Sequence, residues 1–159
     1  MSLRLVATRV LPALALLLAV GAGVSKYLDT SLQGEQRAAK ESVEAARQAT
    51  EAILSYRADT VDRDLNAARD RLTGTFLDSY TSLINETVIP GAREKKISTN
   101  AKVPAVASVS ATTNHAVVLA FVNQTVTIGT GSPTMTPSSV RVTLDKVDGR
   151  WLVSGFDPV

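Results

Sequence analysis

The chain has 159 residues, and its 17 basic and 15 acidic side chains give a formal net charge of +2. This near balance of charge, with only 4% aromatic residues, argues against a nucleic-acid-binding surface. The absence of cysteine excludes disulfides and thiolate metal sites, and the residues after an N-terminal apolar segment suffice for one core.

The N-terminal segment contains an apolar run. Arg4 and Arg9 precede an uncharged stretch from Val10 to Val24, which Lys26 ends. Extended back past Arg9, the run covers about 20 residues, enough for a helix to cross a bilayer. We therefore predict a transmembrane anchor at residues 1–26. Its basic flank predicts a cytoplasmic N-terminus and an extracytoplasmic remainder, as in a single-pass protein of the inner (plasma) membrane. The alternative is a cleaved signal peptide.

Small residues lie four positions apart in this segment, at Ala15, Ala19 and Gly23. They would share one face of the expected helix, where another helix could approach closely. Small residues are also common in any such helix, so the alternative interpretation is that this spacing has no role in packing.

A helical pattern follows the anchor and continues to about residue 97. Apolar residues recur at three- and four-residue steps in a thin stripe of Leu28, Leu32, Ala39, Val43, Ala46 and Ile53. The stretch Gln33–Glu41 is too polar to pack well. We therefore predict a juxtamembrane helical stalk at 27–41 and an extracytoplasmic domain at 42–159.

Two more helices are expected before the strands. Asp59–Asp62 favours a helix start and Thr73–Gly74 a helix end. The next helix should start near Thr75, and Pro90 should kink or interrupt it because proline lacks an N–H. The expected apolar faces are Leu65, Ala68 and Leu72 on the first of these helices, and Phe76, Tyr80, Leu83, Ile84 and Val88 on the second.

From Lys102 the apolar period changes to two, which is typical of strands. The expected strands are 103–111, 116–128, 140–147 and 150–156. The second is apolar on both faces from Ala116 to Val122, which predicts a central strand covered on both sides. Residues 129–139 hold two glycines and two prolines and are predicted to be a loop. Met135 in this loop could touch lipid or a partner, or the loop could simply be a long connection.

The last two strands are expected to form a hairpin. Asp148–Gly149 is a strong signal for a two-residue turn, because both of its positions need positive φ. The register then pairs Leu144 with Val153, Val142 with Gly155 and Lys146 with Trp151. One face would hold Val140, Val142, Leu144, Trp151 and Val153, and the other Arg141, Thr143, Asp145, Leu152 and Phe156. Lys146 is expected to lie across Trp151.

Together these elements predict an α+β fold in which helices cover one face of a curved, four-stranded antiparallel sheet. A pocket could lie between the two layers. Asn123 and Gln124 interrupt the most apolar strand, either as the polar floor of such a pocket or because the strand reaches the sheet edge. The candidate lining residues are Phe76, Tyr80, Leu83, Val118, Ala120 and Asn123.

The sequence contains no recognisable catalytic or metal-binding motif. His115 is the only histidine, and a zinc site needs several ligands. Asp59, Asp62 and Asp64 are interpreted as a helix start and a solvated face. Asn85 and Asn123 begin glycosylation triplets that fall on an expected helix and an expected strand, so we expect neither to be used. We expect no catalytic residue, no metal and no cofactor.

A set of short motifs is distributed over most of the chain. The segments are Val118–Thr125, Arg141–Leu144, Lys146–Val153 and Asp157–Val159, with Leu72–Gly74, Phe76, Tyr80, Glu86–Val88 and Pro90 upstream. In order and spacing these segments resemble the Mce-associated membrane proteins of actinobacteria. The resemblance implies a fold like that of the nuclear-transport-factor superfamily. It also implies an accessory role beside Mce systems, which import sterols or fatty acids. It supplies no catalytic or lipid-binding residues.

Three functions are compatible with these observations. The first is a non-enzymatic accessory subunit that joins other membrane subunits, a layout also found in inner-membrane subunits of type IV secretion systems. The second is a carrier of a lipid or small molecule, with an apolar pocket between helices and sheet. The third is an enzyme, which would need a buried carboxylate or histidine and has no support from the fold alone.

Overall fold

The computed structural model describes residues 33–159. The expected anchor, with Ala15, Ala19 and Gly23, lies outside the described residues. The chain divides into units 1–36 and 37–159. Within residues 33–159, no helix is both long and apolar enough to cross a bilayer.

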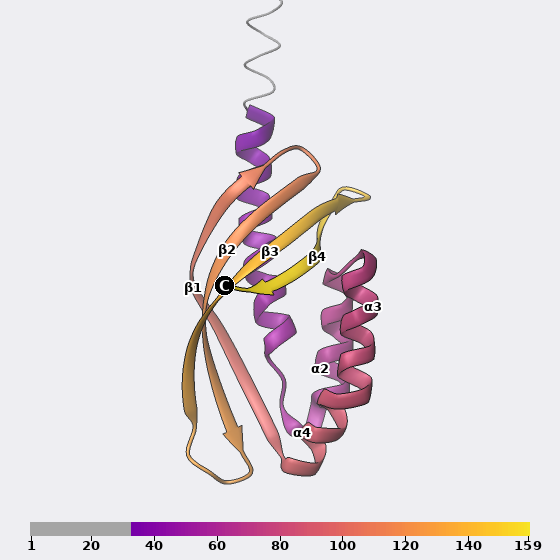
Figure 1. Cartoon of the computed structure of the whole chain (residues 1–159), viewed down its shortest axis with the longest axis vertical. Coiled ribbons are helices and arrows are strands. Elements are labelled where there is room, and N and C mark those ends of the chain that lie inside the picture. The colour runs from indigo at the N-terminus through magenta and orange to yellow at the C-terminus, as the bar shows by residue number, and fades with distance from the viewer. Residues whose placement is uncertain (1–32) are drawn as a thin grey trace, which may run out of the picture. The chain divides into compact units, whose positions relative to one another are not determined.

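The unit 37–159 contains helices followed by a sheet (Figure 1). A helix occupies 33–54 and is followed by η1 (Ala58–Thr60), α2 (Val61–Ala68), η2 (Arg69–Arg71), α3 (Gly74–Leu83), the π-helical turn η3 (Ile84–Val88) and α4 (Ile89–Lys95). The strands are β1 (Ile97–Ala111), β2 (His115–Ile128), β3 (Thr134–Val147) and β4 (Arg150–Pro158), in the spatial order β1-β2-β3-β4. All neighbouring strands are antiparallel.

The helices pack on one face of the curved sheet, so the predicted α+β fold of nuclear-transport-factor type is confirmed (Figure 1). One core lies between the two layers, and Leu65 of α2 belongs to the same buried cluster as Val118, Leu144 and Val153 of the sheet. Each of these side chains is no more than 1% exposed. The core is mostly aliphatic, and burial of such side chains is the main contribution to the stability of the fold.

The first helix places small side chains in this core. Its buried residues include Ala38, Ala46 and Ala49, which are at most 3% exposed. Ala38 lies within the segment 27–41 that the sequence assigns to the stalk, and the compact unit begins at Arg37. Alanine at these positions lets the helix backbone lie close to its neighbours, because no long side chain stands between them.

The first helix and the residues after it also cover the outer edge of β1. The backbones of Tyr56 and Thr99 exchange two hydrogen bonds, of 3.0 and 2.8 Å. Further along, Ser55 Oγ accepts from the Ala101 N–H at 2.9 Å, and Glu51 accepts from the Val103 N–H at 3.3 Å. An edge strand otherwise offers unpaired backbone groups to other chains. These contacts satisfy that edge over the first half of β1.

Two predicted boundaries in the sheet were wrong. β1 begins at Ile97, not near Lys102, because Lys96 adopts a left-handed conformation (φ 52°) that ends α4 and turns the chain into the strand. Most of the predicted loop 129–139 is strand, since β3 begins at Thr134 opposite Val126. Pro137 fits there because β4 pairs with β3 only from Val140 onward, which leaves Pro137 on an open edge.

The β3–β4 hairpin has the predicted turn, with φ of 49° at Asp148 and 78° at Gly149. The predicted pairs Leu144–Val153 and Lys146–Trp151 are confirmed. The predicted pair Val142–Gly155 was wrong, because β4 contains a β-bulge. Gly155 lies opposite Thr143 and Phe156 opposite Val142, so Ser154 has no partner. The extra residue moves Phe156 from its predicted outer face to the core face.

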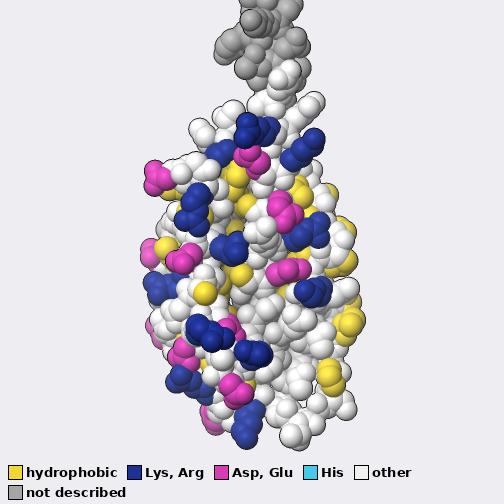
Figure 2. Space-filling view, turned by 180° about the vertical axis from the view of Figure 1, so that it is seen from behind, with side chains coloured by type: hydrophobic (Ala, Val, Ile, Leu, Met, Phe, Trp, Pro, Cys, Tyr) yellow, Lys and Arg dark blue, Asp and Glu magenta, His cyan; other side chains and the backbone are white. Residues whose placement is uncertain are grey.

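Charged side chains are unevenly distributed over the domain. No Asp, Glu, Lys or Arg occurs between Val103 and Val140, a stretch that comprises most of β1, all of β2 and the start of β3. Figure 2 shows charged side chains over much of this face, and they are sparse at its lower right, where the turn between β2 and β3 lies. The outer face of β2 is not covered as predicted, since Phe121 is 46% exposed.

Candidate functional site

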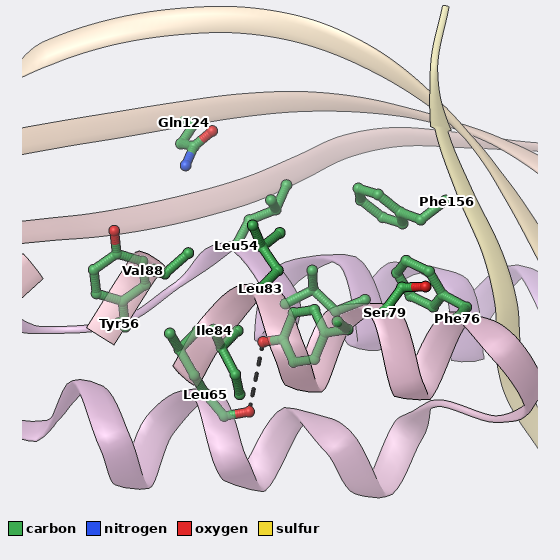
Figure 3. A pocket seen from close by; sticks show the side chains of 12 residues that line it. Leu54, Tyr56, Leu65, Phe76, Ser79, Leu83, Ile84, Val88, Gln124 and Phe156 are labelled. Atoms are coloured by element: carbon green, nitrogen blue, oxygen red, sulfur yellow. Dashed lines mark hydrogen bonds between the residues drawn. The ribbon is translucent and has the colours of Figure 1, made fainter. Parts of the chain in front are cut away.

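The candidate site is a cavity of about 370 Å³ between the helices and the sheet (Figure 3). Its walls come from the end of the first helix, from α2, α3 and η3, and from β2 and β4. The lining residues are Ile53, Leu54, Tyr56, Leu65, Phe76, Ser79, Tyr80, Leu83, Ile84, Val88, Gln124 and Phe156. Ten of these side chains are aliphatic or aromatic, and the other two are Ser79 and Gln124. The ten carry only two polar atoms, the hydroxyl oxygens of Tyr56 and Tyr80.

The helical wall owes its shape to Pro90. In an α-helix the N–H of residue 90 would bond to the carbonyl of Glu86, and proline has no N–H to donate. The predicted interruption is present as the π turn η3, which precedes Pro90 and continues directly into α4. Ile84 and Val88, the two ends of η3, both line the cavity. Isolated π turns are frequent at functional sites, so this turn marks the wall as a candidate.

The bulge in β4 supplies the aromatic end of the cavity. Phe156 stacks on Phe76 with ring centroids 6.1 Å apart and planes inclined by 18°, and Phe76 in turn contacts Tyr80 at 6.2 Å. Figure 3 shows the rings of Phe76 and Phe156 facing each other at one end. Sequence reasoning missed Phe156 because strict alternation places it outside. Gly155 was the available signal, since glycine within a strand often marks a bulge.

The polar groups of the cavity are few and uncharged. Gln124 projects its amide from β2 toward the helices, and Ser79 lies on α3 (Figure 3). The hydroxyl of Tyr80 donates to the Leu65 carbonyl at 3.5 Å. Burial raises the pKa of Tyr80 well above its usual value, with a further contribution from Tyr56, and burial also raises the pKa of Tyr56. Both phenols therefore stay neutral, and the site is suited to an apolar ligand.

The structure brings together half of the predicted pocket residues. Phe76, Tyr80 and Leu83 line the cavity, whereas Val118 and Ala120 are fully buried in the core and do not reach it. Asn123 is not part of the lining either. The next residue, Gln124, does line the cavity, because successive side chains of a strand point to opposite faces of the sheet.

The other candidate residues have structural partners. His115 Nδ1 lies 2.7 Å from Asp145 Oδ1 across the β2–β3 pair, and hydrogen bonds from Ser154 and His115 lower the pKa of Asp145. Asp62 pairs with Arg93, and Asp64 accepts from the Arg57 N–H at 3.3 Å. Within residues 33–159, no group of three acidic or histidine side chains could hold a metal ion.

A second polar cluster ties the first helix to the β3–β4 hairpin. Glu41 accepts from Arg37 at 2.8 Å, from Lys146 at 3.0 Å and from the Trp151 indole at 3.3 Å. As predicted, Lys146 lies over Trp151, with its Nζ 5.3 Å from the ring centroid. These hydrogen bonds, the strongest from Arg37, lower the pKa of Glu41 to about 2. We call these four residues the Glu41 latch.

Comparison with known proteins finds similar sequences in Mycobacterium tuberculosis. No protein-family model matches it. The chain is 55% identical to outer membrane protein Rv1973 of Mycobacterium tuberculosis over 98% of both chains. The chain belongs to the Rv1973 family. It is also 44% identical to the uncharacterized protein Rv1362c of the same species, over 80% of this chain and 58% of that protein.

Solved structures with the same fold include secretion-system proteins. The periplasmic domain of DotI matches with a TM-score of 0.63 and 16% identity, over 74% of this chain and 91% of that domain. An IcmL-like type IV secretion system protein of Legionella pneumophila matches with a TM-score of 0.59 and 10% identity, over 74% of this chain and 88% of that chain. At such low identity these matches establish the fold of this member of the Rv1973 family. Neither set of comparisons shows an association with Mce systems.

Proposed function

We propose that this member of the Rv1973 family is a non-enzymatic accessory subunit of a membrane-associated, Mce-type complex that imports lipids such as sterols or fatty acids. Residues 1–26 would anchor it in the inner membrane, with the rest of the chain, including the compact unit from Arg37 onward, on the extracytoplasmic side. The name of Rv1973 as an outer membrane protein supports a place in the cell envelope. The positions of Arg4 and Arg9 favour the inner membrane for the anchor.

The observation that carries this proposal is the likeness of the domain to the periplasmic domain of DotI and to the IcmL-like secretion-system protein. The part of DotI that matches is periplasmic, so an envelope protein uses this fold outside the cytoplasm. The cavity lining has no carboxylate, histidine or lysine, and its two phenols have raised pKa values and stay neutral, which supports a role without acid–base chemistry.

Affinity purification of the full-length protein from its native membrane tests the proposal. The protein is extracted in a mild detergent, and mass spectrometry identifies the proteins and lipids that remain bound. Recovery of Mce transporter subunits in fixed ratio is the expected result. Recovery of the protein alone, under conditions that keep a known membrane complex intact, would contradict it.

The expected anchor offers a matched pair of variants for the same purification. Gly23→Leu adds bulk to the face shared by Ala15 and Ala19, whereas Ala13→Leu adds similar bulk on a different face of the expected helix. Loss of partner subunits with Gly23→Leu alone would assign this face to helix packing. Unchanged recovery with both variants would discard it.

The second candidate function is a carrier of a lipid or small molecule, and the cavity favours it. A cleft of about 370 Å³ with apolar walls lies within the size range of small-molecule sites. Lipid retained in stoichiometric amount by a protein purified without partner subunits would support the carrier over the accessory subunit.

A further inference from the structure

The cavity has a closed floor and an open mouth. Leu65 and Ile84, at 1% exposed, and Tyr80, at 6%, form its buried floor. Leu83 is 53% exposed and Ser79 is also exposed, so these two side chains of α3 mark where the cavity meets solvent. Leu83 faces both the cavity and water. A ligand that covered this side chain would lower the free energy, because it would remove apolar surface from water.

The size of the cavity limits what can enter. At about 30 Å³ for each water-sized group, a volume of about 370 Å³ holds roughly twelve such groups, the size of a methylene. This matches one linear chain of about a dozen carbons. A four-ring sterol has more than twice as many carbons, so more than half of its atoms would have to stay outside the cavity.

The walls limit the chemistry as well. No Asp, Glu, Lys, Arg or His lines the cavity, so a charged group inside would be buried without a partner. The polar atoms are the Gln124 amide, the Ser79 hydroxyl and two phenols, which can at most accept or donate a few neutral hydrogen bonds. The head group of an amphiphile would therefore stay at the mouth, beside Ser79 and Leu83.

We propose that the cavity binds a single linear hydrocarbon chain, as in a fatty acid or one acyl chain of a lipid, with its head group in solvent at the mouth. Phe76 and Phe156 close one end of the cavity, and η3 supplies the wall along which the chain lies. The inference rests on the carrier function proposed above and names its ligand class. It does not depend on which subunits the protein joins.

Photo-crosslinking of the full-length protein in phosphatidylcholine vesicles tests this. The probe is dodecanoic acid that carries a diazirine, and mass spectrometry locates the adducts. Adducts are expected on Phe76, Leu83 and Phe156 at least tenfold more often than on Val109 and Met135, which are exposed but lie outside the cavity. An excess of unlabelled dodecanoate should remove them, and cholesterol should not.

Two serines of α3 provide matched variants. Ser79 and Ser82 are both exposed on the same helix, but only Ser79 lines the cavity. Ser79→Trp should cover the mouth and lower the labelling at least tenfold, while Ser82→Trp should leave it unchanged. Thermal unfolding confirms that both variants fold, and Leu83→Trp at the same mouth replaces Ser79→Trp if that variant does not.

Three outcomes would overturn the inference: labelling spread evenly over exposed apolar residues, equal labelling of the two serine variants, or equal competition by cholesterol. Equal competition by cholesterol would overturn the ligand class but leave the carrier function standing, whereas evenly spread labelling would overturn both. None of the three outcomes bears on recovery of partner subunits by affinity purification.

Discussion

Two regions of the helix–sheet interface are packed in opposite ways. Near the β3–β4 hairpin the first helix contributes alanines to the core, and the Glu41 latch joins it to Lys146 and Trp151. Beside η3 the helical wall carries large side chains such as Tyr80 and Ile84, and a cavity of about 370 Å³ remains. Small contact residues allow close approach, whereas large ones at a distorted helix hold the layers apart. The filled region thus contributes most to stability, whereas the hollow region leaves a cavity between the layers.

A matched pair of leucines tests this contrast most strongly. Leu144 is fully buried in the filled region, whereas Leu83 is 53% exposed at the cavity. Leu144→Ala should lower the free energy of unfolding by about 2–5 kcal/mol, and Leu83→Ala by less than about 1 kcal/mol. Urea denaturation of the full-length protein in nanodiscs gives both values. Equal losses would mean that the two regions are packed alike.

Phe156→Ala tests how the bulge builds the hollow region. The unpaired Ser154 places Phe156 opposite Val142 on the core face, where its ring stacks on Phe76. We expect a loss of about 2 kcal/mol in the free energy of unfolding, since Phe156 is only partly buried. Ser154→Ala, which removes only a hydroxyl from the bulge, is the control. A Phe156→Ala variant as stable as Ser154→Ala would refute the assigned role of the bulge.

Replacement of two glycines by alanine should change the stability of the protein in opposite directions. Gly149 sits at φ 78° in the hairpin turn of the filled region, where a Cβ is strained, so Gly149→Ala should destabilise by about 1 kcal/mol. Gly91 lies in α4 with open space around its Cα, so Gly91→Ala should stabilise by up to about 1 kcal/mol. Thermal unfolding midpoints report the signs, and a shift in the same direction for both would contradict the turn geometry.

The Glu41 latch predicts the smallest effect, a weak dependence of stability on acid pH. The pKa of the Glu41 carboxyl is lowered from 4.5 to about 2 in the folded protein. The ionised carboxylate therefore stabilises the fold fully above pH 4.5, and this stabilisation is lost as the pH falls from 4.5 through about 2. Trp151 is the only tryptophan, so its indole N–H resonance in NMR reports the latch directly. The resonance should titrate near pH 2, and Glu41→Gln should abolish that titration. A midpoint near pH 4.5 would mean that the latch does not form.

The sequence alone predicted the features that depend on local patterns. Asp148–Gly149 determined the hairpin turn, because positive φ is required at both positions whatever surrounds them. Period-two alternation and the helical stripes determined the α+β fold. Pro90 predicted an interrupted helix from the chemistry of one residue. The pairs Leu144–Val153 and Lys146–Trp151 followed from counting outward from the turn.

Only the tertiary structure decided the cavity and the features that shape it. Alternation cannot reveal the bulge at Ser154, because one unpaired residue is stabilised by contacts such as Phe156 with Phe76, which are distant in sequence. Pro137 could enter β3 only because β4 ends opposite Val140, which no local pattern records. The choice of Gln124 over Asn123 as the polar group of the cavity also depends on which face of β2 the helices cover. Local chemistry therefore determined the elements, and long-range packing decided where space was left between them.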